Sequence, residues 1–142
     1  IDSVLERARI AVARMGVRGL VIDPYNYIEL PRNDGTETTA ISDMLTRVQK
    51  FIKAHDVHCW FIAHPSKINR SGVEQPRPDG MSISGSMAWW AKTDCGITVH
   101  RQERYVEIAV WKCRHRWVGT QGETTLLYNK TAGNYTENLD QF

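Results

Sequence analysis

The sequence has 142 residues and a formal net charge of only +2. Hydrophobic residues make up 42% of it and charged residues 24%, as in ordinary globular domains, so we expect a single domain over 1–142. No strong affinity for polyanions follows from so small a net charge, so we expect any nucleic-acid contact to come from local clusters of Lys and Arg. No apolar run approaches the roughly 20 residues that span a bilayer, so no membrane partner is expected.

The cysteines indicate the redox environment. Cys59, Cys95 and Cys113 are odd in number and widely spaced. This spacing favours neither a disulfide framework nor a zinc site, and it is typical of a protein from a reducing compartment.

The beginning of the chain predicts a helix followed by a strand. Apolar residues at helical spacing indicate a helix up to residue 15, with Asp2 and Ser3 as its cap and Gly16 as its left-handed end. The apolar run 19–22 stops at Asp23. Such a run is typical of a strand buried on both faces in a parallel sheet.

A second helix and strand follow. The helix is expected from Thr36 to about His55, with one apolar stripe. Its predicted buried positions are Ile41, Leu45, Val48 and Ile52. A buried strand over 58–63 comes next, and the order strand, helix, strand predicts a parallel pair joined by a crossover helix.

The stretch from Ser66 to Ser84 is rich in proline, glycine, serine and basic residues. A loop of this length is more often functional or disordered than structural. The short helix expected over 86–91 carries Trp89 and Trp90, which we expect to pack in the core or a subunit interface rather than stack on bases. The rest of the chain predicts a turn at 101–104 and strands at 95–100, 105–111 and 124–128.

Two polar residues follow the predicted parallel strands, at the edge where ligands bind in open α/β sheets. Asp23 is suited to hold the water shell of a Mg²⁺ ion that bridges nucleotide phosphates. His64 is suited to hydrogen-bond a terminal phosphate and to report it to the following loop. Each signal is weak by itself, because loop carboxylates and satisfied histidines are common.

The segment 112–122 is strongly basic where a strand enters a glycine-marked hairpin. Its basic or potentially basic side chains are Lys112, Arg114, His115 and Arg116. An arginine projected from a hairpin reaches a phosphate that another subunit holds. The alternative is a solvated turn.

The order of these features resembles the second half of the motor domain of DnaB-like, RecA-fold replicative helicases. The segments 112–122 and 128–133 are particularly similar to the phage primase–helicase and Twinkle branch, and the resemblance runs from about Gly19 to Glu137. It implies an α/β fold with a partial RecA-like (P-loop NTPase) core. Parallel strands with crossover helices would precede a C-terminal antiparallel hairpin.

The resemblance also implies roles for residues in the nucleotide site. Asp23 matches the Walker B aspartate that positions Mg²⁺ through water, and His64 matches the γ-phosphate sensor. Asn26 falls where relatives place a polar residue that links the nucleotide and DNA sites. Arg116 matches the arginine finger for the neighbouring subunit, with Arg114 as a second basic residue. Alternatively, Lys112 and Arg114 form that pair.

The basic loop corresponds to the DNA-binding loop in the central channel of these helicases. Lys67, Asn69, Arg70 and Arg77 are the expected phosphate contacts. The backbone amides of Gly85 and Ser86, at a helix N-terminus, also favour a phosphate. Such contacts follow the backbone of single-stranded DNA and ignore base identity.

The function that the resemblance implies is hexameric, ATP-dependent translocation on single-stranded DNA with duplex unwinding. ATP, or another nucleoside triphosphate, and Mg²⁺ are the implied cofactors. Two alternatives stay open: another RecA-like ATPase, of the recombinase or RepA type, and a non-catalytic module for DNA binding or assembly. The expected location is the cytoplasm of a bacterial or phage-infected cell, or else an organelle matrix.

One motif of the family is missing from these residues. The phosphate-binding loop, G-x-x-x-x-G-K-[ST], does not occur in the 142 residues, and neither does the glutamate that activates water on the strand after it. We therefore expect these residues alone not to hydrolyse ATP.

Overall fold

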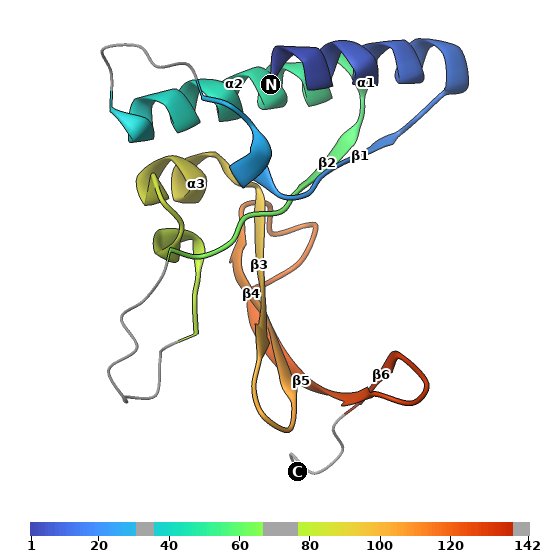
Figure 1. The fold of residues 1–142 in the computed structure, drawn as a ribbon, viewed down its shortest axis with the longest axis vertical. Helices are drawn as coiled ribbons and strands as arrows, with labels where there is room; N and C mark the ends of the chain where they lie inside the picture. Colours follow the sequence, from blue (N-terminus) through green and yellow to red (C-terminus); the bar gives the residue numbers. More distant parts are fainter. Residues whose placement is uncertain (31–35, 67–76, 138–142) are drawn as a thin grey trace. The chain divides into compact units, whose positions relative to one another are not determined.

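The computed structural model describes residues 1–30, 36–66 and 77–137 (Figure 1). The chain divides into two compact units, which are described separately. The first unit is formed by Ile1–Lys67 and Ile83–Lys92, and the second by Ile68–Ser82 and Thr93–Phe142. None of the helices in the described ranges has the length and apolar character needed to cross a membrane.

Helix α1 (Asp2–Met15) opens the first unit and ends at Gly16, whose φ of 66° is the predicted left-handed stop. The predicted cap is wrong. Ile1 occupies the N-cap position without a side-chain cap, and Asp2 already lies in the first turn. The Asp2 carboxylate instead pairs with Arg47 of the second helix, with 2.7 Å between Oδ2 and Nη1.

Helix α2 (Glu37–His55) begins as predicted, because the Thr36 Oγ1 atom accepts a hydrogen bond of 3.3 Å from the Thr39 N–H. Ile52 is only half-buried, contrary to prediction. The buried face consists of Ile41, Met44, Leu45, Val48 and Phe51. The stripe is therefore wider than the single predicted row and is centred nearer to Met44 and Phe51.

Strands β1 (Gly19–Ile22) and β2 (His58–Phe61) pair in parallel from Gly19↔His58 to Ile22↔Phe61. The predicted parallel unit is confirmed. Burial on both faces is wrong, because the register partners Val21 and Trp60 are 63% and 51% exposed. Only the other face of this two-stranded sheet, which carries Ile22, is covered within the described residues.

Helix α3 (Ser86–Lys92) completes the core of the first unit by packing on α2. Trp89 is only 4% exposed, and its ring meets Tyr25 and Phe61 edge-on at centroid distances of 4.9 and 5.2 Å. Its Nε1–H donates a hydrogen bond of 2.9 Å to the Ser84 carbonyl. The prediction that this tryptophan packs in the core is confirmed.

Truncation of Trp89 is expected to destabilise the first unit strongly. Trp89→Ala removes a buried ring and its hydrogen bond, so we expect the free energy of unfolding to fall by about 3–5 kcal/mol. Trp117→Ala is the matched control, because Trp117 is 83% exposed, and it should change stability by about 0.5 kcal/mol or less. Urea denaturation followed by circular dichroism measures both. Equal losses for the two variants would contradict this packing.

The second unit contains a four-stranded antiparallel sheet in the order β3-β4-β5-β6. Its strands are β3 (Cys95–Arg101), β4 (Val106–Cys113), β5 (Gly122–Asn129) and β6 (Asn134–Glu137). The three predicted strands and the turn at 101–104 are confirmed in position. Strand β6 was not predicted, and it extends the expected C-terminal hairpin into a meander.

The turn between β5 and β6 explains the residues of the 128–133 segment. The Asn129 Oδ1 atom accepts hydrogen bonds of 3.0 and 3.1 Å from the N–H groups of Thr131 and Ala132. Gly133 has a φ of 67°, and its N–H donates to the Asn129 carbonyl at 2.8 Å. Asparagine and glycine are therefore required here by turn geometry.

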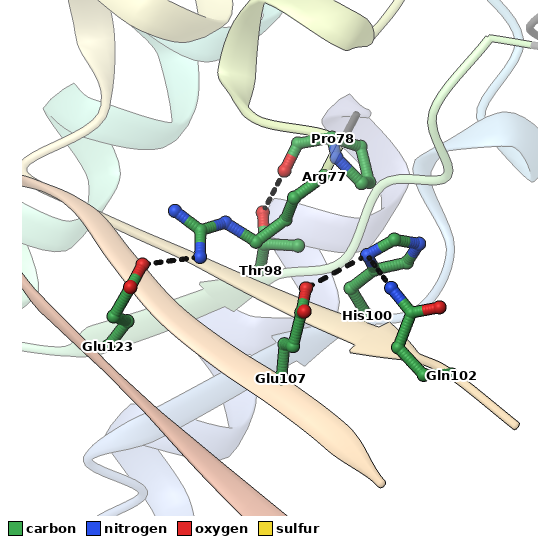
Figure 2. Close-up of polar contacts among 7 residues, drawn as sticks. All are labelled: Arg77, Pro78, Thr98, His100, Gln102, Glu107 and Glu123. Atoms are coloured by element: carbon green, nitrogen blue, oxygen red, sulfur yellow. Dashed lines mark hydrogen bonds and ion pairs between the residues drawn. The ribbon is translucent and has the colours of Figure 1, made fainter. Parts of the chain in front are cut away.

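Arg77 and Pro78 form polar contacts with the same sheet, as Figure 2 shows. The Arg77 guanidinium forms an ion pair of 2.5 Å with Glu123 on β5. The Thr98 hydroxyl on β3 donates a hydrogen bond of 2.7 Å to the Pro78 carbonyl. A short 3-10 helix, η2 (Gly80–Ser82), follows. The end of the long predicted loop thus has fixed contacts within the second unit.

Candidate functional site

The ends of the two parallel strands lie next to each other in the first unit. Ile22 and Phe61 are register partners, and the Ile62 N–H donates a hydrogen bond of 2.8 Å to the Ile22 carbonyl. Asp23 follows β1 directly, and His64 follows β2 after two more residues. The prediction that both residues follow neighbouring parallel strands is therefore confirmed, but β2 ends at Phe61 and not at residue 63, so His64 lies three residues beyond it.

The Asp23 side chain is exposed and forms no ion pair with any residue in the described ranges. Mg²⁺ in nucleotide sites usually keeps several waters and takes one or two protein carboxylates besides phosphate oxygens. A single accessible carboxylate fits that mode of binding. No group of three or more potential metal-binding side chains occurs in the part of the chain that the structure describes.

The backbone after Asp23 is anchored on the end of β2. The Tyr25 N–H donates a hydrogen bond of 3.0 Å to the Ile62 carbonyl, and the Tyr25 ring is buried in the core. Asn26 lies exposed in the 3-10 helix η1 (Tyr25–Tyr27) that follows. One segment, held to β2 through Tyr25, thus carries both Asp23 and Asn26.

His64 is exposed and lies just before the basic loop. Three of the predicted DNA contacts, Lys67, Asn69 and Arg70, lie outside the described residues. The strand end therefore leads directly into the segment for which DNA contacts were predicted. Those contacts remain predictions.

The basic hairpin of the second unit has a well-defined base. We call residues 114–121, which connect β4 to β5, the arginine loop. The Arg114 guanidinium forms an ion pair of 3.1 Å with Asp94, and the Arg114 backbone N–H donates to the Asp94 carbonyl at 2.8 Å. At the other end, the Gln121 Nε2–H donates a hydrogen bond of 2.9 Å to the Trp111 carbonyl.

The tip of the arginine loop carries a different arginine. Arg116 is exposed and makes no ion pair within the described ranges, whereas the Arg114 guanidinium is held by Asp94. Burial lowers the pKa of Lys112, and the charge of Arg114 lowers it further. The charge of Asp94 raises this pKa, but by less. The two candidate finger arginines thus have different surroundings, because Arg114 pairs with Asp94 and Arg116 is exposed.

The remaining predicted contact residues have structural roles. Gly85 has a φ of 68°, and a Cβ atom there would lie 2.5 Å from the Cδ1 atom of the fully buried Ile41. Ser86 is the first residue of α3. Arg77 is paired with Glu123. These observations explain why glycine occurs at position 85, and they leave the predicted DNA contacts untested.

Sequence reasoning missed two interacting groups in the second unit. Asp94 received no role from the sequence, although its carboxylate forms an ion pair with Arg114. The Arg101 guanidinium lies 5.7 Å from the centre of the Tyr128 ring, which also contacts Tyr135 at 5.0 Å. Tyr128 and Tyr135 are cross-strand partners, so a prediction of β6 would have paired them.

Comparison with known proteins gives a clear relative by sequence. The chain is 41% identical over 145 residues to the Twinkle homolog protein, chloroplastic/mitochondrial, of Arabidopsis thaliana. The aligned region covers 96% of this chain but only 20% of that protein. No family model matches the chain.

Two solved structures share the fold. One, an ATPase domain, matches with a TM-score of 0.76 and 18% identity, over 96% of this chain and 51% of that one. The other, a DnaB-like replicative helicase solved for its interactions with primase, matches with a TM-score of 0.75 and 18% identity, over 95% of this chain and 35% of that one. The predicted α/β, RecA-like fold is confirmed.

Proposed function

We propose that this chain is a segment of a DnaB-like replicative helicase and supplies part of an ATP-driven motor that moves along single-stranded DNA and separates duplex DNA. Its 41% identity to a Twinkle homolog and its likeness in fold to two solved structures support this proposal. Both units would belong to one motor domain of a hexamer. The proposal rests on one observation above all: Asp23 and His64 follow the carboxyl ends of adjacent parallel strands. Ligands of open α/β sheets bind at that edge.

In this proposal the strand ends form the nucleotide side of the motor. Asp23 would hold Mg²⁺ through its water shell, and the ion would neutralise phosphate charge when bound. His64 would hydrogen-bond the terminal phosphate. Because His64 leads into the basic loop, its contact with phosphate would bias the position of that loop, and Asn26 would connect the same site to DNA.

The arginine loop would serve the nucleotide of a neighbouring protomer. Two facts bear on which arginine acts. Arg116 is exposed and has no ionic partner in the described part of the chain, so it is available to another subunit. In the alternative register, Lys112 and Arg114 are the acting pair. Arg114 would then first have to break its ion pair with Asp94. The exposure of Arg116 supports the first register.

The basic loop would bind the DNA backbone. Lys67, Asn69 and Arg70 are its proposed contacts, together with the amides of Gly85 and Ser86. Arg77 already pairs with Glu123, so it would contribute less than the other two cations. A loop that binds phosphates explains how a chain with a net charge of only +2 could hold DNA.

Loss of the loop cations should appear as a change in salt dependence. For the double variant Lys67→Ala/Arg70→Ala, two phosphate contacts are removed. The slope of log affinity for single-stranded DNA against log salt should therefore decrease in magnitude by about 1.4. Lys53→Ala/Lys50→Ala on α2 is the matched control. Fluorescence anisotropy with a labelled oligonucleotide measures the slope, and an unchanged slope would remove the loop from the DNA path.

The proposed function is tested with a version of the protein that includes a phosphate-binding loop. We expect ATP turnover that single-stranded DNA stimulates, and strand separation of a forked duplex. The competing candidate is a non-catalytic DNA-binding module, which would need only the basic residues of the loop. DNA binding without any turnover would support that candidate instead.

The relative found by sequence supports one of the two proposed cellular locations. The Arabidopsis thaliana protein is described as chloroplastic/mitochondrial. For this chain we propose either an organelle matrix or the cytoplasm of a bacterial or phage-infected cell. Fluorescent tagging in the source organism distinguishes them.

A further inference from the structure

Two of the three cysteines lie opposite each other on adjacent strands of the antiparallel sheet of the second unit. Cys95 begins β3 and Cys113 ends β4, and the two residues are register partners. Side chains of directly opposed residues lie on the same face of a sheet. Both cysteines are free thiols, with Cys95 exposed and Cys113 half-buried. The pair lies directly before the arginine loop, because Arg114 follows Cys113.

The hydrogen bonds around the pair determine how closely the two residues approach. The Arg114 N–H donates to the Asp94 carbonyl at 2.8 Å, so the ladder bond joins the residues that flank the pair. Cys95 and Cys113 therefore form a non-hydrogen-bonded pair, in which Cα atoms typically lie about 4.5 Å apart. Disulfides bridge Cα separations of about 4.4–6.8 Å. The backbone already has the spacing that a disulfide needs.

We propose that Cys95 and Cys113 are a redox-active pair that forms a reversible cross-strand disulfide at the base of the arginine loop. The wide spacing of the three cysteines in the sequence predicted no framework of several structural disulfides. A single reversible disulfide between two paired strands is a different kind of bond. In a reducing compartment, disulfides that form are usually transient or redox-sensing. The proposal is independent of the proposed function, because it depends only on strand pairing and thiol access.

The reaction requires an external oxidant, for which a low-molecular-weight disulfide such as oxidised glutathione suffices. One protein thiolate attacks a sulfur of that disulfide, forms a mixed disulfide and releases one glutathione thiolate. The second protein thiolate then attacks the protein sulfur of the mixed disulfide and displaces the second glutathione. Two electrons pass from the protein thiols to the oxidant, and two molecules of glutathione leave in reduced form.

The pH dependence of this reaction follows from the thiolate. Burial, and secondarily the neighbouring charge of Cys113, raises the pKa of Cys95. A raised pKa lowers the thiolate fraction at neutral pH, so the oxidation rate should rise as the pH increases towards that pKa. The dependence of the pKa of Cys95 on Cys113 agrees with their positions as cross-strand neighbours.

The third cysteine is an internal control. Cys59 lies on β2 in the first unit, and burial raises its pKa to about 11. At neutral pH its thiolate fraction is about 100-fold below that of an unperturbed thiol, so it should react slowly in the folded chain. Mild oxidants and alkylating reagents should therefore distinguish Cys59 from the proposed pair.

The test incubates the reduced chain in glutathione buffers of increasing oxidised fraction, then quenches with iodoacetamide and measures mass. We expect a species lighter by two hydrogen atoms, in which Cys95 and Cys113 resist alkylation together. Cys59 should become alkylated after denaturation, and dithiothreitol should restore all three thiols. Hydrogen exchange at the Arg114 amide should slow in the oxidised form, because the crosslink holds its ladder bond closed.

Three variants make the result specific. Cys59→Ser should oxidise as the parent chain does, whereas Cys95→Ser and Cys113→Ser should stop at a glutathione adduct on the remaining thiol. The proposal is overturned if Cys95 and Cys113 stay alkylatable throughout, or accumulate as two separate glutathione adducts. Disulfides that include Cys59 or that link two chains would overturn it as well.

Discussion

Alanine in place of the finger arginine should reduce ATP turnover of the complete protein about a thousandfold or more. The guanidinium would stabilise charge that develops on the transferred phosphoryl group of the neighbouring protomer. Binding of the nucleotide should change little, because the binding protomer keeps its own strand ends. We expect this result for Arg116→Ala, since Arg116 is exposed at the loop tip. Steady-state turnover and equilibrium binding of a labelled nucleotide measure the two effects.

Arg114→Ala, measured beside it, decides the register. Arg114 pairs with Asp94, so its removal also disturbs the base of the loop. Asp94→Asn is the matched control, because it weakens the same ion pair while keeping the arginine. If turnover collapses for Arg114→Ala and survives in both Asp94→Asn and Arg116→Ala, then Arg114 is the finger. If both arginine variants keep full turnover, the loop has no catalytic role.

Asp23→Ala is expected to abolish turnover as well, but for a different reason. Without this carboxylate the water shell of Mg²⁺ has no proposed protein anchor at the strand ends, so the loss should again reach about a thousandfold. Raising the Mg²⁺ concentration should recover part of the activity if the aspartate only positions the ion. Turnover measured over a Mg²⁺ titration tests this.

Asp43→Ala serves as the control for a lost carboxylate. Asp43 lies on α2, away from the strand ends in sequence, and has no proposed role in the nucleotide site. Its variant should keep turnover within about twofold. Unchanged turnover in Asp23→Ala would show that the carboxyl end of β1 does not bind the ion.

Much of the fold follows from local pattern. Helical spacing in the region of α2, the apolar runs of β1 and β2, and Gly16 each specify a local conformation that the rest of the structure does not override. The parallel pairing follows from the order of the elements. Asp23 and His64 could therefore be placed after adjacent parallel strands from sequence, although the exact end of β2 at Phe61 could not.

Other features depend on contacts between residues distant in sequence. Asp2 was expected to cap α1, but Arg47, which is 45 residues away, draws its carboxylate into an ion pair. Strand β6 is short and all four of its residues are exposed, so no burial pattern marks it. The exposure of Val21 and Trp60 could not be predicted from sequence either, because an apolar run does not show whether both faces of its sheet are covered.

The two finger registers could not be separated from sequence, because three cations within five residues look alike. The structure separates them by environment: Asp94 holds Arg114, while Arg116 has no ionic partner among the described residues. Asp94 lies directly before β3, the strand that pairs with β4, and is 20 residues before Arg114 in the chain. Strand register, and not local pattern, brings the two together.

Mixing two inactive variants of the complete protein tests the central claim most directly. Asp23→Ala protomers keep the finger arginine, and finger-arginine variants keep the strand ends with Asp23. An interface is therefore intact when the finger-arginine variant supplies the strand ends and the Asp23→Ala protomer supplies the finger. If the arginine acts on a neighbouring protomer, equal mixing should restore up to about a quarter of wild-type turnover, because a quarter of the interfaces are then competent. A chain that carries both substitutions should restore none. No recovery in the first mixture, once exchange of protomers has been verified, would contradict the account.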